Sequence, residues 1–172
     1  MLQPAESSWI EPLVLALYRP TVQLATMLVR DHTVAQDIVQ EAFVRVWLSP
    51  RTPREMNAFR PWLYKTVVNL ARDHHRRQGR WARLRFGRAA SVDPMDVAET
   101  RASDAALGVA MRGLSRRERE AVYIRFFEDA PFDEVGRIIG LRAGTARVLV
   151  HRALAKLRRQ LDTSSRHGVT EP

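Results

Sequence analysis

Apolar side chains recur every three or four residues along most of the chain, which is the repeat of an α-helix. The pattern is plain near the start, in Leu13, Leu17, Leu24 and Leu28, and again near the end, in Val150, Leu154, Leu157 and Leu161. Runs with the two-residue alternation of a β-strand, joined by a tight hairpin turn, do not occur in the sequence. The sequence therefore predicts an all-α chain.

Turn and capping residues divide this pattern into separate helices. We expect helices over about 8–30, 33–48, 58–77, 115–128, 132–139 and 143–161. Pro20 lies inside the first and should kink or interrupt it. Thr33 with Gln36 forms a T-x-x-Q capping signal, and Ser115 with Glu118 forms an S-x-x-E capping box.

Large apolar side chains indicate which side of each helix faces a core. They are Val39, Phe43, Val46 and Trp47 in the second expected helix, Trp62, Val67 and Leu70 in the third, and Ala121, Val122, Ile124, Phe126 and Phe127 after Ser115. Since Trp62 falls on this apolar side, we interpret it as a core residue and not as a platform for stacked bases.

The helical repeat is lost between residues 87 and 103, a stretch rich in Ala, Ser and Asp. Such a composition is typical of a connecting segment. We therefore predict two small helical domains, residues 1–86 and 104–172, joined by a flexible linker over residues 87–103.

The charge distribution indicates a polyanionic partner. Lys and Arg number 28 against 19 Asp and Glu, a formal charge of +9. The excess gathers in two blocks, residues 51–88 with 11 basic and 2 acidic side chains, and residues 105–161 with 12 and 6. Two basic blocks suggest two surfaces that face a polyanion. The alternative is that an arginine-rich composition reflects only a GC-rich genome.

Several other classes of protein are disfavoured. The sequence has no cysteine for a disulfide or thiolate metal site and no uninterrupted apolar stretch of membrane-spanning length (~18–20 residues), and we expect no signal peptide. His74 and His75 are adjacent on a helix and point about 100° apart, which does not suggest a metal site. Without a nucleophile elbow, a Gly-rich phosphate-binding loop or a plausible catalytic triad, we expect neither an enzyme nor a cofactor.

The strongest local signal is a short helix, a glycine turn and a basic helix. Residues 132–139 end at Gly140, which suits the left-handed conformation at a helix C-terminus, and a second helix follows from Ala143. This order predicts a helix-turn-helix, whose second helix enters the DNA major groove. The side chains expected outside are Arg142, Thr145, Arg147, His151 and Arg152, with Lys156, Arg158 and Arg159 further along. The alternative is a helical hairpin with a solvated basic face.

An acidic and amide patch lies in the first half of the chain. Asp37, Gln40 and Glu41 share one side of a helix, with Phe43 turned more toward the core. Because such a patch does not attract DNA phosphates, it suggests a protein partner. An acidic face that is merely solvated is the alternative.

The motifs follow one another in a specific order. The first half carries Asp37-x-x-Gln40-Glu41-x-Phe43-x-x-x-Trp47 and then Phe59-x-x-Trp62-Leu63-x-x-x-x-x-Asn69-x-x-x-Asp73-x-x-Arg76-Arg77. The second half carries Leu114-Ser115-x-x-x-Arg119-x-Ala121, Asp133-Glu134-Val135-Gly136, Gly144-Thr145-x-Arg147 and His151-Arg152-Ala153-x-x-x-Leu157-Arg158. Together they resemble the extracytoplasmic-function (ECF) group of bacterial RNA polymerase sigma factors over nearly the whole chain.

The resemblance implies a sigma factor that binds core RNA polymerase and directs promoter-specific initiation. Residues 1–86 would be a region 2-like domain and residues 104–172 a region 4-like domain. Polymerase would be bound through Asp37, Gln40, Glu41 and Phe43, the −10 element through Asn57, Lys65, Asn69, Arg72, Arg76 and Arg77, and the −35 element through Arg142, Thr145, Arg147, His151 and Arg152. In the linker, Asp93, Asp96 and Glu99 would either mimic phosphates inside the polymerase or belong to a solvated tether.

The resemblance also implies partners and a location. The partners would be the beta-prime clamp and beta subunits of polymerase, promoter DNA and an anti-sigma factor. The protein would act in the cytoplasm without inserting into a membrane, although an anti-sigma factor could hold it at the inner membrane face.

Two departures from the family pattern concern the helix-turn-helix. Val148 and Leu149 stand where related sequences often have Ser and Arg, which leaves the −35 sequence open. Gly136 replaces the usual Ala, a change that costs up to ~1 kcal/mol of helix propensity. A stand-alone helix-turn-helix regulator is the alternative function, but it leaves the acidic patch and residues 51–88 without a role.

Overall fold

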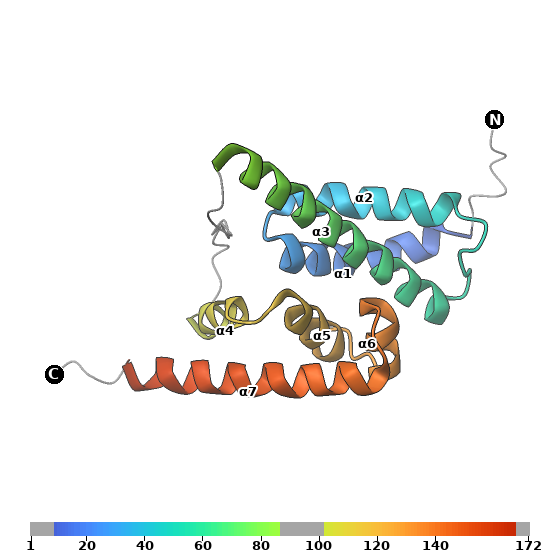
Figure 1. The fold of residues 1–172 in the computed structure, drawn as a ribbon. Helices are drawn as coiled ribbons and strands as arrows, with labels where there is room; N and C mark the ends of the chain where they lie inside the picture. The colour runs from blue at the N-terminus through green and yellow to red at the C-terminus, as the bar shows by residue number, and fades with distance from the viewer. Residues whose placement is uncertain (1–8, 87–101, 168–172) are drawn as a thin grey trace. The chain divides into compact units, whose positions relative to one another are not determined.

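The structure is a computed structural model that describes residues 9–86 and 102–167 of the 172-residue chain. The described residues form seven helices: α1 (Glu11–Val29), α2 (His32–Leu48), α3 (Met56–Phe86), α4 (Ala102–Arg112), α5 (Arg116–Phe126), α6 (Phe132–Ile139) and α7 (Ala143–His167) (Figure 1). The prediction of an all-α chain is confirmed.

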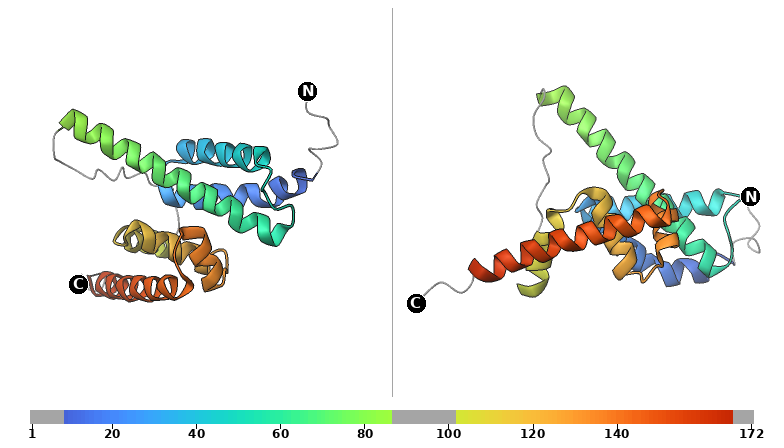
Figure 2. Two further views of the ribbon diagram at one scale, coloured as in Figure 1. Left: turned by 45° about the vertical axis from the view of Figure 1, so that its right-hand side comes forward. Right: turned by 60° about the horizontal axis from the view of Figure 1, so that its bottom comes forward.

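The helices gather into two compact units, α1–α3 and α4–α7. In the first unit α3 packs against both α1 and α2, and in the second α7 packs against α4, α5 and α6 (Figure 2). Two helical domains are therefore confirmed. The expected linker, residues 87–103, lies outside the described residues except for its last two positions, which begin α4.

Helix α1 is continuous through Pro20, so the expected interruption does not occur. The hydroxyl of Thr21 donates a hydrogen bond to the carbonyl of Leu17 at 2.5 Å. By length and composition alone, α1 could cross a membrane. Four of its five leucines, Leu13, Leu17, Leu24 and Leu28, are nevertheless buried in a unit where α1 packs against α2 and α3, which is the arrangement of a core helix.

The predicted cap of α2 is wrong by two residues. Arg30 takes a left-handed conformation (φ 59°) that ends α1, and Asp31 follows as the N-cap of α2. The Asp31 carboxylate accepts a hydrogen bond from the Val34 amide at 2.9 Å, which satisfies one free N–H of the first turn. Thr33 therefore lies inside the helix and not at its start.

Two tryptophans expected in the core are partly exposed. Trp62 is 38% exposed because Phe59, Leu63 and Val67 set the buried side of α3, and Trp62 is turned about 100° from Leu63 at the middle of that side. Trp47 is 39% exposed at the edge of the buried side of α2. Phe43, also on that edge, is half-buried and stacks on Tyr18 of α1, with ring centroids 6.4 Å apart.

The capping box at the start of α5 is confirmed. The Ser115 hydroxyl accepts from the Glu118 amide, and the Glu118 carboxylate accepts from the Ser115 amide at 2.8 Å. Helix α5 ends at Phe126, two residues earlier than expected.

The predicted apolar side of α5 is wrong at its end. Ala121, Val122 and Ile124 are buried, but Phe126 and Phe127 are 53% and 61% exposed, because they are the last residue and the C-cap of the helix. Phe127 stacks on Tyr123 with ring centroids 4.8 Å apart. Burial, assisted by the Glu128 carboxylate, raises the pKa of Tyr123 to about 12, so its hydroxyl stays neutral.

The helix-turn-helix is confirmed. Gly140 takes the left-handed conformation (φ 74°), and the Leu141 amide donates to the Gly136 carbonyl at 2.8 Å. A β-carbon on Gly136 would lie 2.6 Å from the Leu141 carbonyl oxygen. Gly136 therefore lets the turn close against α6, a role beyond the loss of helix propensity expected from the sequence.

Candidate nucleic-acid interface

The outward side of α7 and of the turn before it gathers the side chains expected to meet DNA. Arg142, Thr145, Arg147, His151 and Arg152 are all exposed. The opposite side of α7 is buried, in Ala146, Val150, Ala153 and Leu157. Helix α7 therefore has one side for the core of its unit and another that, together with Arg142 of the turn, presents three arginines to solvent.

An aromatic ring orients one of these arginines. The Arg147 guanidinium lies 5.1 Å from the ring centroid of Phe132, the first residue of α6. The Arg125 guanidinium lies 5.4 Å from the same centroid. Cation–π attraction to the ring restrains Arg147 beside the turn that joins the two helices.

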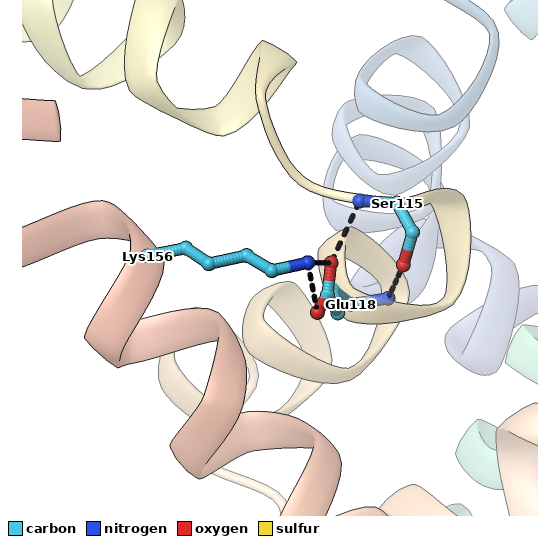
Figure 3. A network of polar contacts seen from close by, with 3 residues as sticks. All are labelled: Ser115, Glu118 and Lys156. Atoms are coloured by element: carbon cyan, nitrogen blue, oxygen red, sulfur yellow. Dashed lines mark hydrogen bonds and ion pairs between the residues drawn. The ribbon is translucent and has the colours of Figure 1, made fainter. Parts of the chain in front are cut away.

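The middle of α7 is fixed to α5 by an ion pair (Figure 3). The Lys156 ammonium lies 2.7 Å from Oε1 and 2.9 Å from Oε2 of Glu118, whose side chain is only 6% exposed. Burial acts to raise the pKa of Glu118, but the hydrogen bonds from Lys156 and Ser115 outweigh it and hold that pKa below its ordinary value. Glu118 is thus a buried carboxylate that stays charged.

This pair corrects the placement of Lys156. The sequence grouped Lys156 with the outward basic residues of α7, whereas the structure turns it toward α5. The role of Glu118 toward α7 was missed, although its place in the capping box was recognised. A sequence signal for the pair is weak, because 38 residues separate the two side chains.

Helix α3 carries the residues expected at the −10 element. Lys65, Asn69, Arg72 and Arg76 follow one another at spacings of four, three and four residues and so share one side of the helix. Arg72 is half-buried and the other three are exposed. The exposed Trp62 lies on this side too, one turn before Lys65, and was missed because the sequence placed it in the core.

Two expected −10 residues do not share that side. Asn57 is exposed in the first turn of α3, and Arg77 is exposed but turned about 100° from Arg76. Arg76 itself is paired with Asp73, and this hydrogen bond lowers the pKa of the Asp73 carboxyl. The structure thus brings together four of the six residues in one row.

The two histidines of α3 have different surroundings. His75 Nε2 lies 3.0 Å from the Leu28 carbonyl oxygen, which connects α3 with the end of α1. Partial burial lowers the pKa of His74, against the opposing effect of Asp31. Among the described residues, no three His, Cys, Asp or Glu side chains come together as a metal site would require.

The exposed side of α2 that carries the acidic patch also carries apolar residues, which the prediction from the sequence did not include. Asp37, Gln40 and Glu41 are exposed on one side of α2, and Glu41 pairs with Arg45 at 2.6 Å. The same side continues through two exposed apolar residues, Val44 (49%) and Leu48 (65%). Exposed apolar groups beside polar ones on one helix face are compatible with the apolar core and polar rim of a protein–protein interface.

Comparison with known proteins covers both units. Residues 13–80 match the family of sigma-70 region 2, and residues 110–159 match the family of sigma-70 region 4. The chain is 30% identical to the RNA polymerase sigma factor SigV of Bacillus subtilis over 81% of its own length and 82% of that protein. It is 34% identical to the RNA polymerase sigma factor CarQ of Myxococcus xanthus over 85% of its own length and 86% of that protein.

A solved structure has the same fold. It is the sigma factor RpoE of Bartonella quintana in complex with the anti-sigma factor NepR. The alignment covers 88% of this chain and 96% of that one, with a TM-score of 0.72 and 22% sequence identity.

Proposed function

The chain belongs to the sigma-70 family of RNA polymerase sigma factors, in its ECF group, and we propose that its two units divide promoter recognition between them. As a sigma factor it directs RNA polymerase to specific promoters. In the proposed division, α1–α3 bind core polymerase and the −10 element, and α4–α7 bind the −35 element. The observation that carries this proposal is the outward face of α7, cationic and next to a glycine turn, in the same chain as a separate basic row on α3.

The second unit would read duplex DNA. Helix α7 fits the major groove, where Arg142, Thr145, Arg147, His151 and Arg152 would reach base edges and phosphates. The Phe132 ring would keep the Arg147 guanidinium in position, so less side-chain freedom is lost on binding. The Glu118–Lys156 pair would hold α7 in the orientation that presents this face.

The first unit would open the −10 element. Lys65, Asn69, Arg72 and Arg76 form a row along α3 that suits the DNA backbone, and Asn57 and Arg77 would contact the strands from the adjoining surface. The exposed Trp62 offers an aromatic face in the same row. Aromatic stacking compensates for part of the cost of removing a base from the duplex, a few kcal/mol.

Helix α2 would dock on polymerase. Asp37, Gln40 and Glu41 would contact the beta-prime clamp, where charged groups give specificity and a fast association rate. Val44 and Leu48 would supply apolar contact area beside them. Phe43 is half-buried against Tyr18, so its role would be to shape this surface more than to contact polymerase.

Further partners follow from the same surfaces. We propose that the second unit also contacts the beta subunit, and that an anti-sigma factor covers the docking helix and keeps the protein inactive. The site of action would be the cytoplasm, with retention at the inner membrane face if the anti-sigma factor is itself anchored there. The factor would do no chemistry, since the polymerase supplies the catalytic centre.

Reconstitution with core polymerase tests the proposal. The purified chain and core enzyme are mixed with a library of promoter fragments, and the transcripts are sequenced. Shared elements near −10 and −35 of the start sites are expected. A protein that shifts duplex DNA alone but gives no initiation would be a stand-alone regulator, a function that leaves residues 13–80 without a purpose.

A further inference from the structure

Val148 is an exposed apolar side chain in the first half of α7, with 49% of its surface accessible. At about 100° per residue, it points away from the buried stripe of Ala146, Val150, Ala153 and Leu157. It thus stands at the centre of the outward face and takes no part in the core of its unit.

Helix formation does not account for a valine at this position. A β-branched side chain loses rotamer freedom in a helix, and valine is a poorer helix former than alanine, lysine or arginine. An exposed position of α7 that served solubility alone would favour one of those residues. A contact with a partner would explain the branched apolar side chain at this position.

The surroundings of Val148 narrow the choice of partner. Thr145 lies one turn before it and Arg152 one turn after it, with Arg147 and His151 beside them, and all four are exposed. A polar, cationic rim around a single apolar group suits a polyanion better than an apolar protein surface. In the major groove, the apolar group on the edge of a base pair is the 5-methyl group of thymine.

We propose that Val148 contacts the 5-methyl group of a thymine in the −35 element and selects for thymine at that position. The inference rests on the proposed function, in which α7 enters the major groove. Val148 would thus supply discrimination at one base pair, in place of the polar contact that a serine would make.

The test removes the methyl group and nothing else. The full chain, bound to core polymerase, first selects a −35 element from a promoter library. Each thymine of that element, on either strand, is then replaced in turn by deoxyuridine. We expect one replacement to weaken binding by the wild-type holoenzyme about fourfold, because the thymine methyl group is no longer there to be buried.

Two substitutions at Val148 assign the effect to this side chain. Val148→Ala should bind the thymine and deoxyuridine duplexes equally, whereas Val148→Thr keeps a methyl group and should remain sensitive. Val109 of α4 provides the matched control, since it is 52% exposed in the same unit. Val109→Ala should retain the wild-type response to the methyl group.

The outcomes separate this inference from the function it rests on. Three results would refute the contact while −35 recognition stands. The selected element could hold no thymine, or no deoxyuridine replacement could weaken binding by the wild type. The third is a Val148→Ala variant that still binds the deoxyuridine duplex more weakly than the thymine duplex. If the holoenzyme selects no −35 element at all, the proposed function fails and the inference fails with it.

Discussion

Lys156 of α7 holds both carboxylate oxygens of Glu118 on α5, at 2.7 and 2.9 Å. The same carboxylate accepts the Ser115 amide and so also caps α5. The second helix of the helix-turn-helix is therefore attached to the start of α5, a segment 38 residues away in sequence. This attachment fixes α7 independently of the turn at Gly140.

Removing the lysine should destabilise the second unit. Lys156→Met leaves the nearly buried Glu118 carboxylate without its cation, and we expect the free energy of unfolding to fall by about 1–3 kcal/mol. Chemical denaturation followed by circular dichroism would measure the change. All four tryptophans precede residue 87, so their fluorescence reports on the first unit and should not shift. Arg158→Met, at an exposed position, is the control; equal losses in both variants would refute the role of the pair.

The pair should also make stability depend on pH in acid. The pKa of Glu118 is lower in the folded chain than its ordinary value of 4.5, so its contribution is complete above that value. The contribution is lost as the pH falls through the folded-state pKa. The stability difference between wild type and Glu118→Gln should therefore be constant near neutral pH and shrink below about pH 4.5. Denaturation curves at several pH values would show this; a difference that grows in acid would contradict it.

Alanine should lower stability at Gly140 in the turn and at Gly136 of α6, which packs against the turn, but not at Gly108 of α4. Gly140→Ala forces a β-carbon into a left-handed conformation and should cost about 1 kcal/mol. Gly136→Ala should cost more, because its β-carbon meets backbone 2.6 Å away. Gly108→Ala in α4 has open space around it and should stabilise the chain by about 0.5–1 kcal/mol. Thermal unfolding ranks the three, and a Gly136→Ala variant as stable as Gly108→Ala would disprove the close approach.

The salt dependence of DNA affinity should change when an arginine that faces DNA is replaced, but not when Lys156 is replaced. We expect Arg152→Met to reduce the slope of log affinity against log salt by about 1, because one phosphate contact is lost. Lys156→Met should leave the slope unchanged even if affinity falls. Titrations of the selected −35 duplex at several salt concentrations test this. Equal changes of slope would place Lys156 on the DNA.

The sequence predicted those features that local chemistry decides. The capping box at Ser115, the turn at Gly140 and the outward arginines of α7 depend on residues a few positions apart, and the structure agrees with each. The errors concern choices that packing decides. Trp62 is exposed because Phe59 and its neighbours, and not Trp62, occupy the side of α3 that packs against α1 and α2.

Long-range and competing contacts were the other source of error. Glu118 and Lys156 meet only once α5 and α7 have packed, so no local pattern announces them. The cap of α2 was misplaced because two acceptable capping residues, Asp31 and Thr33, stand close together. The turn at Arg30 decides between them in favour of Asp31.

The division of labour between the two units is tested most directly by a crossed comparison of two variants. Core polymerase affinity and promoter choice at saturating factor are measured for Gln40→Ala/Glu41→Ala and for Arg147→Ala. We expect the double variant to bind polymerase less tightly by about 1–3 kcal/mol and to keep its −35 preference once bound. Arg147→Ala should bind polymerase normally and lose about 1–3 kcal/mol of discrimination at one −35 position. If either variant lost both properties together, the two units would not act separately and the account would be contradicted.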